Sequence, residues 1–241
     1  MVKIFRSFRK RLLQESKFRK YIMYAIGEIL LVMIGILLAL QVNNWNSNRK
    51  AKNTLRSALE TVTSDLKRDT ITASKLIEVF ENNQETFKLI IDKKITKENY
   101  KDYPMFYSLV TLYQPFNIQT KGYDILKNIS NQKTSERDSI FDDLTQFYSL
   151  LGPNLKKSNE RLEKVVLDNL ADFQEFPWFV DWTQGKLTDE MLTYFTTSED
   201  YRKRVAAYNV LAYGNHFGLI RLYKENAKKV LKALGERLDD D

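Results

Sequence analysis

The feature that most constrains this chain is an uninterrupted apolar run near its N-terminus. Residues 21–42 read YIMYAIGEILLVMIGILLALQV, and Glu28 is the only charged side chain among them. As an α-helix the run extends about 33 Å, which matches the hydrocarbon core of a bilayer. Tyr21 and Tyr24 near one end and Trp45 beyond the other are typical of interfacial aromatic belts. We therefore predict one transmembrane helix over 21–42, with these three aromatic residues as interface anchors and the lipid bilayer as a partner.

A cleavable signal peptide is the weaker interpretation of this run. The basic region before it is long for a signal peptide, and the run leaves through residues 40–43 (LQVN) without a small-x-small cleavage pattern. Beyond residue 42 there is no other stretch that is apolar and long enough to cross a bilayer. The expected protein therefore crosses the membrane once.

The distribution of charge predicts the orientation of the span. The formal net charge is +7, and residues 1–20 carry eight basic side chains against one acidic side chain, so the rest of the chain is neutral overall. Fewer basic residues follow the span than precede it. The positive-inside rule then places residues 1–20 in the cytoplasm and the C-terminal domain on the other side.

The basic segment also has an amphipathic pattern. Apolar residues recur at helical spacing between Ile4 and Leu12, while Lys and Arg occupy the other faces. A helix lying in the anionic headgroup layer accounts for both stripes. Nucleic-acid binding accounts for the charge alone, so we expect no nucleic-acid partner.

After the span, apolar residues recur at alternating spacings of three and four. This heptad pattern predicts a long, coiled-coil-like first helix over about 50–91 that packs along a narrow seam. Asp69 and Asn83 occupy two seam positions, where polar residues often fix register or oligomeric state. The apolar seam residues are Leu55, Leu59, Val62, Leu66, Ala73, Leu76, Phe80, Phe87 and Ile90.

The remainder of the chain also reads as helical. We expect short helices over 104–115 and 119–129, and a helical stripe from 134 that Gly152-Pro153 either kinks or divides. A last helix over 201–238 follows a capping sequence at 197–200.

The predicted fold class is therefore all-α. A single N-terminal transmembrane helix continues into an extramembrane antiparallel helical bundle, and the predicted segments are 1–20, 21–42 and 43–241.

Composition excludes much familiar enzyme chemistry. The chain has no cysteine and one histidine, His216, which excludes thiolate chemistry and leaves an imidazole site short of partners. Nucleotide-binding and common hydrolase motifs are absent, and the acidic clusters lack the spacing of a calcium loop. We therefore expect no catalytic residue, no metal and no cofactor. The small residues around His216 permit either close helix packing or a ligand cleft.

Two sets of residues remain functional candidates. Trp178, Phe179 and Trp182 could bind a partner, although closing one end of the bundle is the more common role for such a cluster. Inside the span, Glu28 requires an explanation, because intramembrane carboxylates cost free energy and usually face protein. It either lies near the cytoplasmic boundary, next to basic residues, or contacts another subunit. Gly27 and Gly35 would allow close helix association, which favours a homo-oligomer over proton transport.

The N-terminal signature resembles that of a family of Bacteroidota membrane proteins of unknown function. The similarity lies in YAIGEI at 24–29 and IGILLALQVNNWN at 34–46, with looser matches at 123–127 and at Phe147-Tyr148. Family members similarly begin with a basic segment rich in Phe, Arg and Lys. The resemblance implies a location in the bacterial inner membrane and implies no activity. In that membrane the C-terminal domain, which the charge distribution places outside the cytoplasm, would be periplasmic.

These observations favour a non-enzymatic, membrane-anchored helical protein that assembles with itself or binds another envelope protein. A sensory module is the main alternative, since a membrane helix joined to a bundle also suits ligand-driven helix shifts. The cytoplasmic segment is too short to hold an output domain, so a partner would have to relay the signal. A hydrolase based on carboxylate pairs is a third possibility without positive support.

Overall fold

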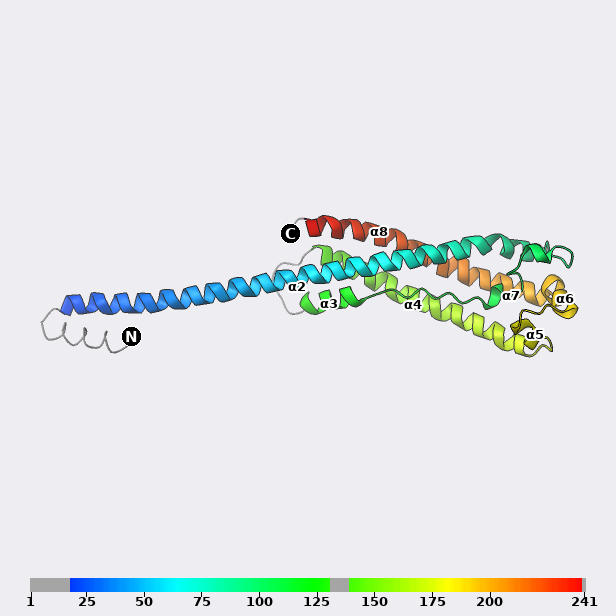
Figure 1. The fold of residues 1–241 in the computed structure, drawn as a ribbon, viewed down its shortest axis with the longest axis horizontal. Coiled ribbons are helices and arrows are strands. Elements are labelled where there is room, and N and C mark those ends of the chain that lie inside the picture. The colour runs from blue at the N-terminus through cyan, green and yellow to red at the C-terminus, as the bar shows by residue number, and fades with distance from the viewer. Residues whose placement is uncertain (1–17, 131–138, 240–241) are drawn as a thin grey trace. The chain divides into compact units, whose positions relative to one another are not determined.

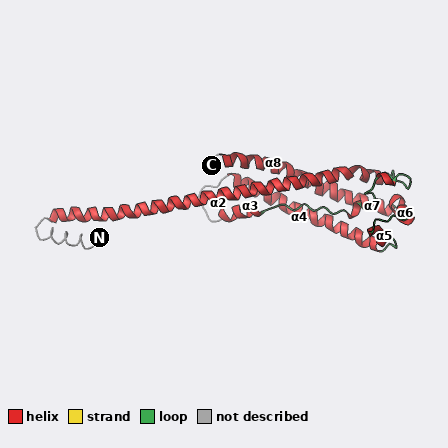
Figure 2. Ribbon diagram, in the orientation of Figure 1, coloured by secondary structure: helices red, strands yellow, loops and turns green. Residues whose placement is uncertain are grey.

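The computed structural model describes residues 18–130 and 139–239. Every regular element in those ranges is helical, which confirms the all-α prediction (Figure 2). The predicted amphipathic segment 1–20 lies outside the described residues, except for the first turn of α2. The chain divides into two compact units, residues 1–55 and 56–241.

Ten helical segments make up the described chain. They are α2 (Phe18–Ile91), the 3₁₀ turns η1 (Tyr100–Asp102) and η2 (Leu109–Thr111), α3 (Lys121–Ser130), α4 (Ser139–Gln174), α5 (Phe179–Thr183), α6 (Asp189–Thr197), α7 (Glu199–Asn209), the π-helical segment η3 (Val210–Phe217) and α8 (Gly218–Asp239).

The first unit contains the N-terminal part of α2, up to Leu55. Its large apolar side chains between Ile22 and Trp45 are all exposed, with 41–73% of their surface accessible. No part of the most apolar stretch is buried by protein. Within the described residues, α2 is the one helix that is long and apolar enough to cross a membrane.

The second unit is built around the seam of α2. Each predicted apolar seam residue from Leu59 to Ile90 is buried, and Asp69 is buried with them. The seam packs against other helices of its own chain.

Side-chain contacts define the direction of the three long helices. Along α2, Asp69, Phe80 and Phe87 contact Tyr223, Tyr213 and Tyr208 in turn, so α2 is antiparallel to the α7–η3–α8 helix. Along α4, Phe147 contacts Tyr223 and the later residue Ser158 contacts His216, so α4 is also antiparallel to the C-terminal helix.

It follows that α2 and α4 run in the same direction, and only the C-terminal helix is antiparallel to them (Figure 1). The expected all-antiparallel bundle would need consecutive long helices to reverse. Here residues 112–120 cross back between α2 and α3 as an extended chain.

Four local predictions are resolved by the helix boundaries and caps. Pro153 lies inside α4, so Gly152-Pro153 does not divide that helix. The expected helix over 104–115 is wrong: turns and the short η2 occupy residues 104–111, and extended chain follows. The predicted helix over 119–129 is present as α3, and Ser198 caps α7 by accepting from the backbone N–H groups of Asp200 and Tyr201.

Candidate functional site

The most unusual feature of the second unit is a stretch of turns, one short 3₁₀ helix and extended chain that passes through the bundle interior and ends in the first turn of α3. We call residues 106–122 the central segment. Phe106, Leu109, Val110 and Phe116 in it are almost completely buried. A backbone that lacks a helical or sheet ladder must find other hydrogen-bond partners when it is buried.

Buried polar side chains of the surrounding helices provide these partners. The described chain has six buried polar or charged residues, and each contacts the central segment directly or through one neighbour. The six residues are Asp65, Asp69, Ser158, Asn159, Asn169 and His216.

Two asparagines of α4 hold the middle of the central segment. The Asn159 side chain accepts from the Phe116 N–H and donates to the Phe116 carbonyl, both at 3.0 Å, and so imitates a paired strand. Asn169 donates to the Val110 carbonyl at 3.0 Å. Tyr201 and Tyr208 donate in the same way to the carbonyls of Phe106 and Leu112.

His216 belongs to the same set of contacts. Its Nε2 lies 3.0 Å from the Gln114 carbonyl oxygen and its Nδ1 lies 2.9 Å from Ser158 Oγ. Because a carbonyl only accepts, Nε2 carries the proton and Nδ1 accepts from the Ser158 hydroxyl. Burial lowers the pKa of His216, which favours this neutral tautomer. A serine nucleophile also donates its hydroxyl proton to a histidine ring. His216, however, is fully buried, and its other ring nitrogen holds the Gln114 carbonyl.

Two aspartates of α2 hold the end of the central segment. Asp69 Oδ2 accepts from the Gln119 N–H at 2.9 Å and from the Tyr223 hydroxyl at 2.7 Å. Asp65 accepts from the Gly122 N–H at 2.9 Å, in the first turn of α3. A carboxylate at a helix N-terminus satisfies an otherwise unpaired donor and opposes the positive end of the helix dipole.

The aspartate contacts require a very close approach of α3 to α2. A Cβ atom added to Gly122 would lie 2.4 Å from the Val62 backbone nitrogen and 2.7 Å from the Val62 Cα. Only glycine fits there without moving backbone atoms.

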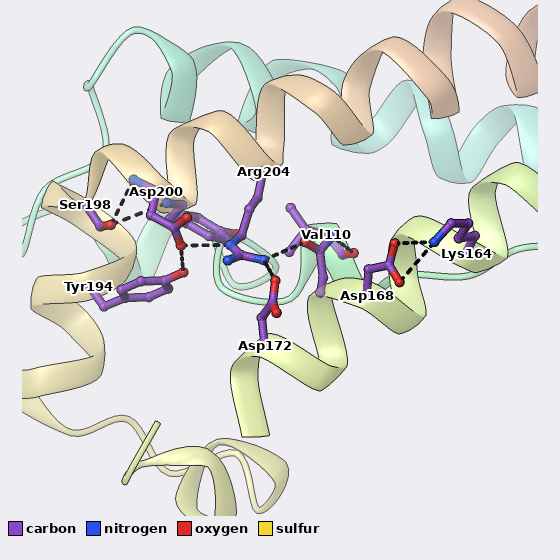
Figure 3. A network of polar contacts seen from close by, with 10 residues as sticks. Val110, Lys164, Asp168, Asp172, Tyr194, Ser198, Asp200 and Arg204 are labelled. Carbon is purple, nitrogen blue, oxygen red and sulfur yellow. Dashed lines mark hydrogen bonds and ion pairs between the residues drawn. The ribbon is translucent and has the colours of Figure 1, made fainter. Parts of the chain in front are cut away.

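A second polar network centres on Arg204 of α7 (Figure 3). Its guanidinium donates to Asp200 at 2.7 Å, to Asn169 at 3.2 Å and to Asp172. Burial alone would raise the pKa of Asp200, but hydrogen bonds from Arg204 and Tyr194 lower it. The network links α4, α6 and α7 to one another. Through Asn169 of α4, which donates to the Val110 carbonyl, it also reaches the central segment.

The predicted aromatic cluster lies at the α5 end of the second unit. Trp178 is buried, and its ring stacks on Phe176 with 4.7 Å between centroids. Phe179 and Trp182 are half-buried, and the Trp182 indole donates to the Tyr107 carbonyl at 3.2 Å. Of the three candidates for partner binding, Trp178 therefore lies in the core, and Trp182 also holds the central segment.

The candidate residues of the predicted span lie in the first unit. Gly27 and Gly35 have open space where a Cβ would stand, and Glu28 is half-buried. Tyr24 and Trp45 are exposed. The side chain of Tyr21 lies outside the described residues. No group of three or more His, Asp or Glu side chains in the described ranges could hold a metal ion.

Residues 28–135 match the model of a family of unknown function (DUF6090). The match includes most of the apolar part of α2, its buried seam and the central segment. It supports similarity to an uncharacterised family, whereas the bacterial group and the N-terminal signature stay predictions. No curated protein and no solved structure matches the chain.

Proposed function

We propose that the protein is a non-enzymatic membrane protein whose apolar segment 22–42 anchors the helical domain to a bilayer. The observation that carries this proposal is that the large apolar side chains of that segment are exposed and that no part of the protein buries them. In water such a surface is strongly unfavourable, at about 25 cal/mol per Å², whereas hydrocarbon solvates it well. The N-terminal side is cytoplasmic and the domain is periplasmic in a bacterial inner membrane.

The buried polar side chains support the non-enzymatic part of the proposal. In the second unit these side chains contact backbone groups of the central segment and hold them in place. This arrangement makes a rigid scaffold, as expected for a domain that presents a fixed surface to another envelope protein.

Charges placed in the segment should abolish membrane anchoring. Arginine at the centre of a transmembrane helix costs about 2.5–3.5 kcal/mol of insertion free energy per residue. We expect Leu31→Arg/Leu37→Arg to move the protein from the carbonate-resistant membrane fraction to the soluble or degraded fraction. The matched control is Leu150→Arg/Val180→Arg, which alters two exposed apolar residues of the domain. If the Leu31→Arg/Leu37→Arg protein instead stays in the carbonate-resistant membrane fraction, as the wild type does, the anchor is refuted.

The span is also proposed to join copies of the protein, with Glu28 contacting protein and Gly27 and Gly35 allowing close approach. Glu28→Gln keeps a donor and an acceptor, so assembly should persist. Glu28→Leu removes both and should weaken assembly by about 1 kcal/mol, as for one interhelical hydrogen bond in a membrane. Light scattering of the full chain in detergent measures this. A wild-type monomer at every concentration would contradict the oligomer.

A further inference from the structure

The second unit has a polar groove where α4 faces the π-helical segment and the start of α8. Its volume is about 400 Å³, within the range of small-molecule sites. Asn154, Lys157 and Arg161 of α4 line one side, and Asn215 lines the other. Ser158 also lines the groove, and its hydroxyl is hydrogen-bonded to the ring of the buried His216.

The charged side chains that line this groove are all basic. Lys157 and Arg161 stand four residues apart, so their side chains share one face of α4. Neither has an ion pair with any described residue, and the lining contains no Asp or Glu. Lys164, one turn further on, is by contrast paired with Asp168 at 3.0 Å. Two unpaired cations with amide groups beside them complement an oxyanion that carries two negative charges.

The π-helical segment and two glycines keep the groove open. Residues 210–217 form wide turns, which in other proteins occur frequently at functional sites. Gly214 and Gly218 line the groove, and a Cβ on either would meet no heavy atom within 4 Å. Gly218 has ordinary helical torsions, φ −58° and ψ −41°, so its backbone does not require glycine. The missing side chains leave space that a ligand can occupy.

We propose that this groove is a binding site for a small soluble phosphate monoester. Lys157 and Arg161 bind the phosphate group. The Asn215 amide adds hydrogen-bond donors, and so does the second N–H of Asn154, whose amide nitrogen also donates to the Leu150 carbonyl at 2.8 Å. Leu219 and Leu222 at the edge of the groove contact a short apolar substituent, since Leu222 is 48% exposed. The site is independent of the membrane anchor and needs no catalytic step.

Isothermal titration of the full chain in a non-ionic detergent, at constant ionic strength, tests the site. The probes are inorganic phosphate, butyl phosphate, butyrate, and mixed micelles containing phosphatidylglycerol. We expect both phosphates to bind, butyl phosphate more tightly, and butyrate at least about tenfold more weakly than butyl phosphate. Lys157→Gln/Arg161→Gln should weaken butyl phosphate at least tenfold. The charge-matched control Lys156→Gln/Lys229→Gln, outside the groove, should bind as the wild type does.

A second variant separates occlusion of the groove from a failure to fold. Gly218→Leu fills the groove and favours the helix, so it should keep or raise the melting temperature and abolish binding. Gly235→Leu makes the same change at an open position of α8 outside the groove and should leave binding intact. Binding of butyl phosphate to Gly218→Leu with unchanged affinity would overturn the proposal. So would equal binding of butyrate, or a response only to mixed micelles containing phosphatidylglycerol.

Discussion

Replacing Gly122 with alanine should destabilise the helical domain by about 3 kcal/mol. The added methyl group would clash with backbone atoms, and no change of side-chain rotamer can relieve that clash. The added Cβ would stand 2.4 Å from the Val62 nitrogen. To make room, α3 must move away from α2 and lose the hydrogen bond from the Gly122 N–H to Asp65. Helix propensity alone predicts the opposite sign, a gain of about 1 kcal/mol for Gly→Ala within a helix.

The matched control is Gly235→Ala in α8. This glycine is exposed, and a Cβ there meets nothing within 4 Å. The higher helix propensity of alanine then acts without an opposing clash, and we expect the free energy of unfolding to rise by about 0.5–1 kcal/mol. Urea unfolding of the full chain in detergent, followed by tryptophan fluorescence, gives both free energies of unfolding. Equal stabilisation by the two substitutions would show that α3 does not approach α2 as closely as described.

Replacing Asp69 should have an effect of similar size. Asp69→Leu leaves the Gln119 N–H and the Tyr223 hydroxyl without their shared acceptor. The buried Tyr223 hydroxyl left unpaired costs about 1–3 kcal/mol, and the part-buried Gln119 N–H adds to that cost, so we expect a loss of about 3 kcal/mol in the free energy of unfolding. Asp69→Asn keeps an acceptor oxygen in the same position and should cost less.

The cost of Asp69→Asn should also depend on pH. Burial raises the pKa of Asp69 above its usual value of 3.8, against the opposing hydrogen bonds from Tyr223 and Gln119. The folded state therefore favours the protonated acid. The contribution of Asp69 to stability is largest below pH 3.8 and is lost as the pH rises through its folded pKa. Asparagine does not titrate, so the cost of Asp69→Asn should shrink between pH 4 and pH 7. A cost that grows over that interval would contradict a raised pKa.

The sequence was sufficient to predict the helices that bury a regular apolar stripe. The seam of α2 from Leu59 to Ile90 is buried as its spacing predicts, because heptad spacing places those side chains on one helix face. What lies against that face was not predictable from the spacing. Interhelical seams within a chain and between chains require the same pattern, so the pattern alone cannot distinguish them.

The path of the central segment was missed for a different reason. Its backbone partners are distant in sequence: Asn159 is 43 residues from Phe116, and His216 is 102 residues from Gln114. The signal was present as polar residues within apolar stripes. Asn159 and Asn169 occupy stripe positions of α4, as Asp69 does in α2. A buried polar side chain needs a hydrogen-bond partner. Here the partner is an extended backbone in the core, which an analysis of local sequence patterns does not predict.

The most direct test of the membrane-anchored arrangement is the topology of the full chain. A reporter active only in the periplasm is fused after Asp241, and a reporter active only in the cytoplasm is fused at the same position in a parallel strain. The positive-inside rule and the exposed apolar segment predict activity of the periplasmic reporter and silence of the cytoplasmic one. Deleting residues 22–42 should reverse both readings. Cytoplasmic activity in the intact protein would contradict the proposed orientation, and unchanged reporter activity after the deletion would contradict the anchor itself.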